Sequence, residues 1–195
     1  MSRDSNSYLQ DVSLAFRQAL TEDRKLELEG LGQLLLNEDN ELRFVAETKP
    51  RVFIAYVQED LGHALRVYQV LASEGFQPWL DKKKLLPGQN WPRAIETAIQ
   101  LSDFFIGCFS KKAVLKRGTF QSELRYALEC AQRAPLDEIF FIPLRLENCA
   151  VPSRISSQIQ YVDLFPDWDA GITRVISVMR AQQLARKQKL LPLAG

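Results

Sequence analysis

The stretch VFIAY at residues 52–56 decides the fold class, because a short uninterrupted apolar run is typical of a strand buried on both faces of a parallel sheet. Apolar residues then recur at helical spacing over residues 61–72, and Gly75 ends that helix. A second strand at residues 76–80 contains Pro78, which favours a place at the sheet edge. Further strands are expected at residues 104–109, 139–144 and 161–164, and further helices from Pro92, around Phe120 and from a cap at Asp169. Strands alternating with helices predict an α/β fold with a five-stranded parallel, flavodoxin-like sheet in the order 2-1-3-4-5.

This topology predicts a binding site before any motif is considered. In an open parallel sheet, ligands bind beyond the carboxyl ends of the strands where the strand order reverses, here between the first and third strands. The loops at residues 56–60, 81–89 and 110–119 meet at that edge. Glu123 is expected in the first turn of the following helix, on the flank of its buried face. The sequence lacks the glycine patterns of dinucleotide-binding and NTPase phosphate loops, so neither site is expected.

Composition narrows the class of protein. The 195 residues are 46% hydrophobic and 25% charged with a formal net charge of +1, so no global field attracts nucleic acid or an anionic membrane. No apolar run predicts a membrane helix, and the first residues lack the apolar core of a signal peptide. Three widely spaced cysteines and a single histidine, His63, favour neither a disulfide scaffold nor a zinc site. We therefore expect a cytoplasmic protein without a bound metal.

The first 49 residues differ in pattern from the rest and are predicted to form a small separate module. An amphipathic helix is expected over residues 8–20, followed by a three-stranded β-meander between Lys25 and Val45. Residues 1–50 hold ten acidic and six basic side chains, so this part is acidic. Its strands faintly resemble those of HU-like proteins, but the basic DNA-binding arm of that family is missing. A regulatory or assembly role for residues 1–49 is favoured over DNA binding, with an α/β domain over residues 50–181 and a basic C-terminal tail over residues 182–195.

Several short motifs, in order along the chain, carry a resemblance to a known family. They are VFIAY followed by Glu59-Asp60, GF at 75–76, WLD at 79–81, LPGQNW at 86–91, SD at 102–103 with Ser110, and GTF at 118–120 followed by Glu123-Leu124. Through them, residues 51–180 resemble a Toll/interleukin-1 receptor (TIR) domain of the bacterial kind, in which the loop at residues 81–89 is called the BB loop. One departure is Ala55, where the family usually has serine before the tyrosine.

The resemblance implies one of two activities. Many TIR domains only assemble with other TIR domains, whereas others cleave NAD⁺ and release nicotinamide together with linear or cyclic ADP-ribose. The catalytic members carry a glutamate on the helix after the third strand, and Glu123 matches it. This implies a bacterial NAD⁺ hydrolase of antiphage defence that is activated by oligomerisation and uses no cofactor. The acidic pattern of residues 1–49, outside the resemblance, predicts that this part binds an activating partner. The alternatives are a non-catalytic TIR adaptor or a mimic that blocks host TIR assembly. A receiver domain is disfavoured because Phe109-Ser110 stands where it needs a phosphorylatable aspartate.

Glu123 suits the chemistry of this reaction. Breaking the nicotinamide–ribose bond expels a neutral leaving group from a cation, so one carboxylate that stabilises the oxocarbenium-like transition state is sufficient. The alternative is a glutamate near a helix start, favoured there by the helix dipole. The resemblance further implies NAD⁺-binding roles for Tyr56, Val57, Asp60, Asp81, Leu86, Gly88, Trp91 and Ser110. Trp91 could instead anchor its loop, Tyr56 could face the core, and Ser110 could cap a strand end.

Overall fold

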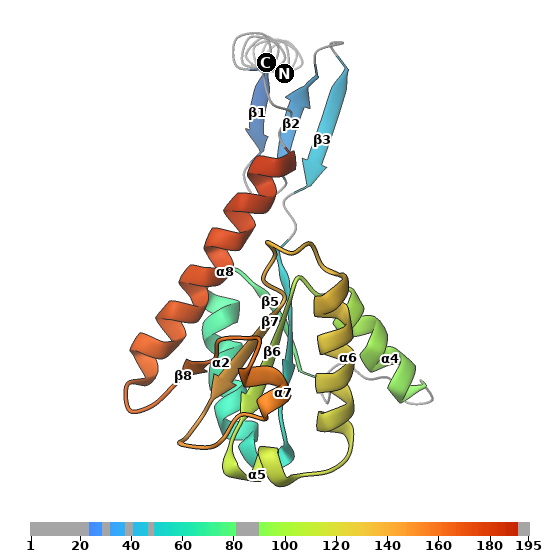
Figure 1. The fold of residues 1–195 in the computed structure, drawn as a ribbon. Coiled ribbons are helices and arrows are strands. Elements are labelled where there is room, and N and C mark those ends of the chain that lie inside the picture. The colour runs from blue at the N-terminus through green and yellow to red at the C-terminus, as the bar shows by residue number, and fades with distance from the viewer. Residues whose placement is uncertain (1–23, 29–31, 38–40, 47–48, 81–89, 191–195) are drawn as a thin grey trace, which may run out of the picture. The chain divides into compact units, whose positions relative to one another are not determined.

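The structure is a computed structural model that describes residues 24–28, 32–37, 41–46, 49–80 and 90–190 (Figure 1). The chain divides into two compact units, Met1–Lys49 and Pro50–Gly195. The amphipathic helix expected over residues 8–20 lies outside the described residues. The described residues cover the small meander of the first unit and most of the second unit. The roles predicted for the two units stay predictions from the sequence.

The first unit contains the predicted meander as an antiparallel sheet in the order β1-β2-β3. Its strands are β1 (Lys25–Leu28), β2 (Gly32–Leu36) and β3 (Leu42–Ala46). The register places Leu26 opposite Leu34, and Leu34 opposite Phe44. Because side chains alternate between the faces of a strand, these three positions share one face of the sheet. The register therefore places three apolar residues in one row across the sheet.

The second unit is a five-stranded parallel sheet in the order β5-β4-β6-β7-β8, which confirms the predicted flavodoxin-like topology. Its elements are β4 (Arg51–Ala55), η1 (Gln58–Asp60), α2 (Leu61–Ser73), β5 (Gln77–Trp79), α4 (Trp91–Gln100), β6 (Phe104–Phe109), α5 (Lys111–Leu115), α6 (Thr119–Arg133), β7 (Phe141–Arg145), α7 (Ser153–Ser156), β8 (Val162–Asp163) and α8 (Trp168–Leu190). Strand β5 lies at the edge, as Pro78 predicts, and the strand order reverses between β4 and β6.

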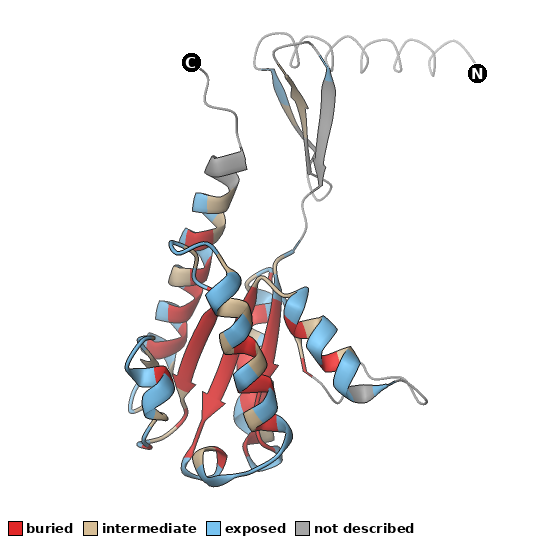
Figure 2. Cartoon of the chain, turned by 45° about the vertical axis from the view of Figure 1, so that its right-hand side comes forward, coloured by how far each residue is buried: buried red, intermediate tan, exposed pale blue. Residues whose placement is uncertain are grey.

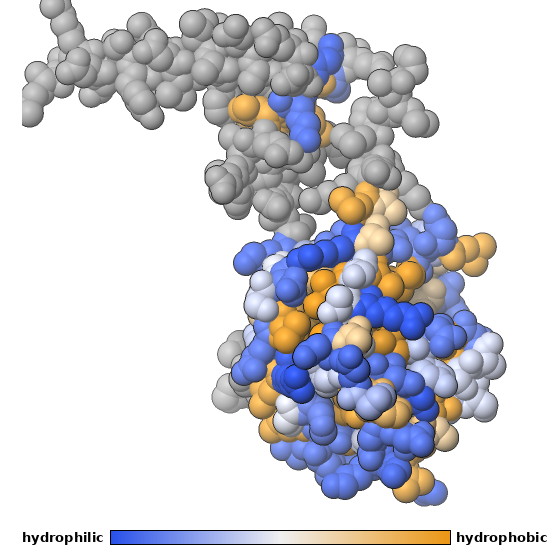
Figure 3. All heavy atoms as spheres, turned by 90° about the vertical axis from the view of Figure 1, so that its left-hand side faces the viewer, coloured by the Kyte–Doolittle hydropathy of each residue, from blue (hydrophilic) through white to orange (hydrophobic). Residues whose placement is uncertain are grey.

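Helices cover both faces of this sheet, so its central strands are buried (Figure 2). On one face α2 and α8 pack over Val52, Ile54 and the other inward side chains of that face. The outer surface of this side is mostly hydrophilic (Figure 3). On the other face α4 and α6 pack over alternate residues of the same strands, among them Phe53 and Phe105. The two clusters together explain why the strands read as continuous apolar runs.

Two glycines set the position of α6 against the sheet. A side chain at Gly107 of β6 would meet the Phe141 ring at 3.0 Å and the Leu124 side chain at 3.1 Å, so the missing Cβ lets α6 approach closely. Gly118, directly before α6, has a φ of +112°, a backbone conformation that other residues rarely adopt. Gly107 and Gly118 therefore fix the height of α6 above β6 and the direction in which the helix begins.

The structure differs from the sequence prediction at the cap of α8 and in three short elements, and it shows the residues that follow 181 as part of a helix. Asp167, and not Asp169, caps α8, since its Oδ1 accepts a hydrogen bond from the Ala170 N–H at 3.0 Å. The helix then continues to Leu190, so the stretch from residue 182 predicted as a basic tail begins inside a helix. Gln182 is buried there, and Arg186 pairs with carboxylates of the sheet unit. The short elements η1, α5 and α7 lie in stretches that the sequence pattern leaves as loops.

Candidate active site

The reversal point of the strand order lies where β4 and β6 end. Tyr56 and Val57 follow β4 and are both buried, but they belong to opposite faces of the sheet. Tyr56 packs into the hydrophobic cluster under α2 and α8, so its side chain faces the core. Val57 packs under α4 and α6, on the face that carries Glu123. Of these two predicted NAD⁺-binding residues, Val57 is the one on that face.

Asp60 and Ser110 meet across this point. The Ser110 hydroxyl donates a hydrogen bond of 2.6 Å to Oδ2 of Asp60, and both residues are buried, at 6% and 3% exposure. The same hydroxyl oxygen accepts the Ala113 N–H at 3.1 Å and so caps α5. Burial, aided by the negative charge of Asp60, raises the pKa of the nearby Cys108 thiol to about 12, so that this thiol stays protonated at neutral pH. The carboxyl edge thus has a dry, polar link between the first and third strands.

Glu123 is buried at 5% exposure in α6, on the side of the sheet that α4 also covers. The helix begins at Thr119, which places Glu123 in its second turn rather than the first turn expected from sequence. The helix dipole acts mainly on the first turn, so it does not explain a buried glutamate here. Leu124 reaches Gly107 in the carboxyl half of β6, which sets Glu123 near the carboxyl edge of the sheet.

Buried polar side chains gather at this edge. Among the described residues, the buried polar or charged ones are Asp60, Ser110, Glu123 and Gln182. The first three belong to the segments that follow β4 and β6, and Gln182 belongs to α8. Burying a carboxyl group costs free energy unless it is compensated, so such a gathering marks a candidate functional site.

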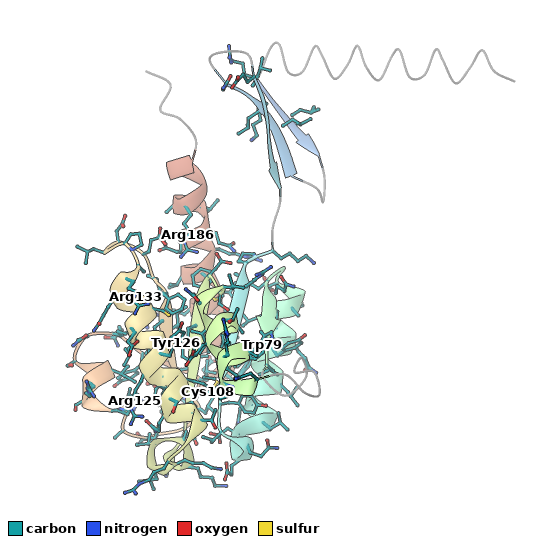
Figure 4. All side chains as sticks on the ribbon, turned by 90° about the vertical axis from the view of Figure 1, so that its right-hand side faces the viewer. Trp79, Cys108, Arg125, Tyr126, Arg133 and Arg186 are labelled. Atoms are coloured by element: carbon teal, nitrogen blue, oxygen red, sulfur yellow. The ribbon has the colours of Figure 1, made fainter. Side chains whose placement is uncertain are left out.

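Glu123 faces the α4 flank of its helix. At 100° per residue, Glu123, Tyr126 and Cys130 share a flank next to the buried row of Phe120, Leu124 and Ala127. The pKa of Tyr126 is raised by burial and by nearby charges that include Glu96 of α4, which identifies this as the α4 side. Figure 4 labels Tyr126 on α6 and Trp79 at the end of β5. Glu123 therefore lies on the side of α6 that is next to α4.

Aromatic rings line the sheet on the face that α4 and α6 cover. The Trp79 ring stacks on Phe53 with a centroid distance of 4.7 Å, and Phe53 stacks on Phe105 at 5.4 Å. The family motif contains Trp79, but the sequence offered no reason to assign it to the site. The stack spans β5, β4 and β6 and so depends on strand order, which no local pattern reveals.

The remaining predicted site residues surround the start of α4. Asp81, Leu86 and Gly88 lie outside the described residues. Trp91 is the first residue of α4, where the Asn90 side chain accepts the Arg93 N–H at 3.3 Å. Residues 81–89 come between β5 and α4 in the chain, and α4 is the helix next to the side of α6 that carries Glu123.

A separate groove of about 640 Å³ lies between α6 and α7. Its lining includes Gln121, Arg125 and Leu128 of α6, and Arg154 and Ile155 of α7. These α6 residues occupy the flank opposite to Glu123, so the groove is not the predicted site.

The described residues contain no group of three or more histidine, cysteine or acidic side chains arranged to hold a metal ion. Within the same residues, no helix has the length and apolar character of a membrane span.

Comparisons with known proteins identify the family of this chain. A family model described as TIR domain matches residues 52–176, well over half of the chain. The uncharacterized protein y4cD of Sinorhizobium fredii is 28% identical over 116 residues, which are 60% of this chain and 18% of that protein. The chain thus spans less than a fifth of the length of this relative.

Solved structures share the fold at low sequence identity. The TIR domain of the Toll-related receptor TRR-2 from Hydra magnipapillata is 21% identical, with a TM-score of 0.52 over 65% of this chain and 97% of that domain. A prokaryotic SEFIR domain is 17% identical, with a TM-score of 0.51 over 67% of this chain and 98% of that domain. These likenesses concern the fold alone, whereas the family match covers the strands and helices that form the candidate site. The chain belongs to the TIR domain family.

Proposed function

We propose that the TIR domain of this chain cleaves NAD⁺ between nicotinamide and ribose, with Glu123 as the catalytic carboxylate. The observation that carries the proposal is the burial of Glu123 in the second turn of α6, near the edge where the strand order reverses. Asp60 and Ser110 are buried at the same edge. Ligands bind at this point of an open parallel sheet, and buried acidic groups there mark a candidate site of chemistry.

The reaction needs little from the protein. The glycosidic C–N bond breaks, its electron pair goes to the nicotinamide nitrogen, and nicotinamide leaves as a neutral molecule. A water oxygen then bonds to the ribose carbon and a proton is released, giving ADP-ribose; attack by a nucleophile of the same molecule gives a cyclic product. The carboxylate of Glu123 stabilises the positive charge that develops on the ribose as the bond breaks.

The predicted contacts to NAD⁺ belong to the same proposal. Val57 is on the sheet face that α4 and α6 cover, and Trp91 is the first residue of α4. Contacts from Asp81, Leu86 and Gly88 are proposed because these residues match the BB loop of the family. Tyr56 packs toward the opposite face, so a contact there would involve its backbone.

Activation by oligomerisation and a role in bacterial antiphage defence rest on the family. TIR domains commonly self-associate, and assembly would bring a second copy to the segment at residues 81–89. The acidic module at residues 1–49 is proposed to receive the activating partner. If the chain is instead a non-catalytic adaptor, it will assemble without consuming NAD⁺.

The test is nicotinamide release by purified protein over a series of protein concentrations. Glu123→Gln keeps the size of the side chain and removes its charge, so we expect release to fall by about 100-fold or more. Glu129→Gln is the matched control, because Glu129 is on the same helix and exposed. Wild-type release that is equal in the Glu123→Gln variant would overturn the assignment. Absence of release at every concentration, also after clustering on beads, would favour the adaptor.

A further inference from the structure

Two consecutive acidic residues of η1 hold the two ends of α5. Asp60 accepts the hydrogen bond from Ser110, the residue that caps the start of α5. Glu59 accepts hydrogen bonds from the Lys116 ammonium at 2.5 and 2.6 Å, and Lys116 is the residue at the end of α5. We name these two contacts together the η1–α5 clamp. It joins the segment after β4 to both ends of the segment after β6.

Helix α5 has reason to need such a clamp. It contains only five residues, and a helix this short is not stable by its own backbone hydrogen bonds. The Asp60–Ser110 contact is buried and excludes competing water. The Glu59–Lys116 pair is partly open to solvent, with side-chain exposures of 38% and 42%, and it lowers the pKa of Glu59. A pair of this kind adds little to global stability, so its main effect is on the local position of α5.

The clamp reaches Glu123 through a short and constrained path. Lys116 is separated from α6 only by Arg117 and Gly118, and the positive φ of Gly118 sets the turn between the helices. The Gln121 side chain of α6 also donates to the Ala113 carbonyl of α5 at 3.4 Å. Movement of α5 therefore moves the first turns of α6, which carry Glu123.

We propose that Glu59, Asp60, Ser110 and Lys116 are positioning residues that hold α5 and thereby set the place of the Glu123 carboxylate. The inference rests on the proposed function for its effect on turnover, but the clamp itself is a statement about local order. Asp60 and Ser110, which the sequence analysis expects to contact NAD⁺ directly, are thereby given a supporting role. A displacement of the carboxylate by about 1 Å costs far more in the transition state than in substrate binding.

The experiment exchanges the charges of the exposed pair. Glu59→Lys and Lys116→Glu are made singly and together, and kcat and KM for NAD⁺ are measured alongside amide hydrogen exchange of residues 111–123. The matched control exchanges Glu74 and Arg180, an ion pair of similar exposure that joins the residue after α2 to α8 at 2.5 Å. Neither control residue belongs to the candidate site.

We expect each clamp variant to lower kcat about 3- to 10-fold with KM changed less than about twofold, and to speed exchange in α5 and at the start of α6. The double exchange should restore both, whereas the control variants should change neither. Wild-type kcat and exchange in the single variants, or no recovery in the double variant, would overturn the clamp. If the wild-type protein does not cleave NAD⁺, the proposed function fails, and the exchange data alone decide whether the clamp orders α5 and α6.

Discussion

The two ends of the central sheet differ in how deeply their acidic side chains are buried. At the amino end, Arg186 of α8 is held by Asp103 at 3.1 Å and by Glu138 at 2.8 Å. At the carboxyl end, Asp60 and Glu123 are buried, and Asp60 is bonded to a hydroxyl group rather than to a cation. Ion pairs occur at both ends, since Glu59 pairs with Lys116 and Arg145 with Asp163 at the carboxyl end. Among the described residues, however, the buried acids are at the carboxyl end alone, and burying a carboxyl group is costly, so this end is the candidate site.

The largest effect is expected from disturbing the approach of α6 to the carboxyl half of β6. Gly107→Val places new methyl groups against Phe141 and Leu124, which already lie 3.0 and 3.1 Å from a Cβ at this position. We expect the free energy of unfolding to fall by about 2–3 kcal/mol, and nicotinamide release to fall with it, because Glu123 shifts. Denaturant unfolding and the release assay measure the two effects.

Gly62→Ala is the control for this substitution. A Cβ at Gly62, in the exposed part of α2, meets no atom within 4 Å. The alanine should raise stability by up to about 1 kcal/mol, since glycine is unfavourable inside a helix. Equal stability of the Gly107→Val variant and the wild type would mean that α6 is not constrained by close contact with β6.

A smaller effect is expected on the free energy of unfolding at alkaline pH. The Cys108 thiol has a pKa of about 12 in the folded chain against 9.0 for the free group, because it is buried. Its contribution to stability is complete below pH 9 and is lost as pH rises toward 12, because the unfolded chain loses the proton first. We expect the wild type to lose about 1.4 kcal/mol per pH unit more than Cys108→Ala above pH 9.5.

Denaturant unfolding at several pH values gives this difference in slope. The comparison of slopes removes the cost of the small cavity that alanine leaves, which is the same at each pH. Parallel slopes for the two proteins would show that Cys108 is accessible to water and that the carboxyl end of β6 is not dry.

The sequence predicted elements whose signal is local and missed those that depend on distant partners. Strand β6 is found at the expected residues, because Phe104–Phe109 is a continuous apolar run between Asp103 and Ser110. Helix α5 carries no apolar period of its own, and its cap depends on Ser110, which Asp60 holds from 50 positions away. The sequence predicted Glu123 in the first turn of α6, but it lies in the second, because the helix start depends on the backbone of Gly118.

The smallest effect is expected from removing residues 1–49. The sheet from β4 onward buries both of its faces with helices of its own unit, so residues 50–195 should unfold at the temperature of the full chain within about 2 °C. NAD⁺ cleavage that depends on Glu123 should persist when this fragment is clustered on beads. Activation by the partner proposed to bind residues 1–49 should be lost. A fragment that is folded but inactive when clustered would place residues 1–49 in the catalytic unit.

The most direct test of the account measures kcat and melting temperature side by side in two variants, one for each end of the sheet. Glu123→Gln should lower kcat by about 100-fold or more while the melting temperature changes by less than about 2 °C, because glutamine keeps the size of the side chain and can still form hydrogen bonds. Arg186→Met should lower the melting temperature by about 3–6 °C, since it unpairs Asp103 and Glu138, and leave kcat within about twofold at 25 °C. A Glu123→Gln variant that keeps its kcat but melts earlier would contradict the account, because Glu123 would then be an attachment like Arg186.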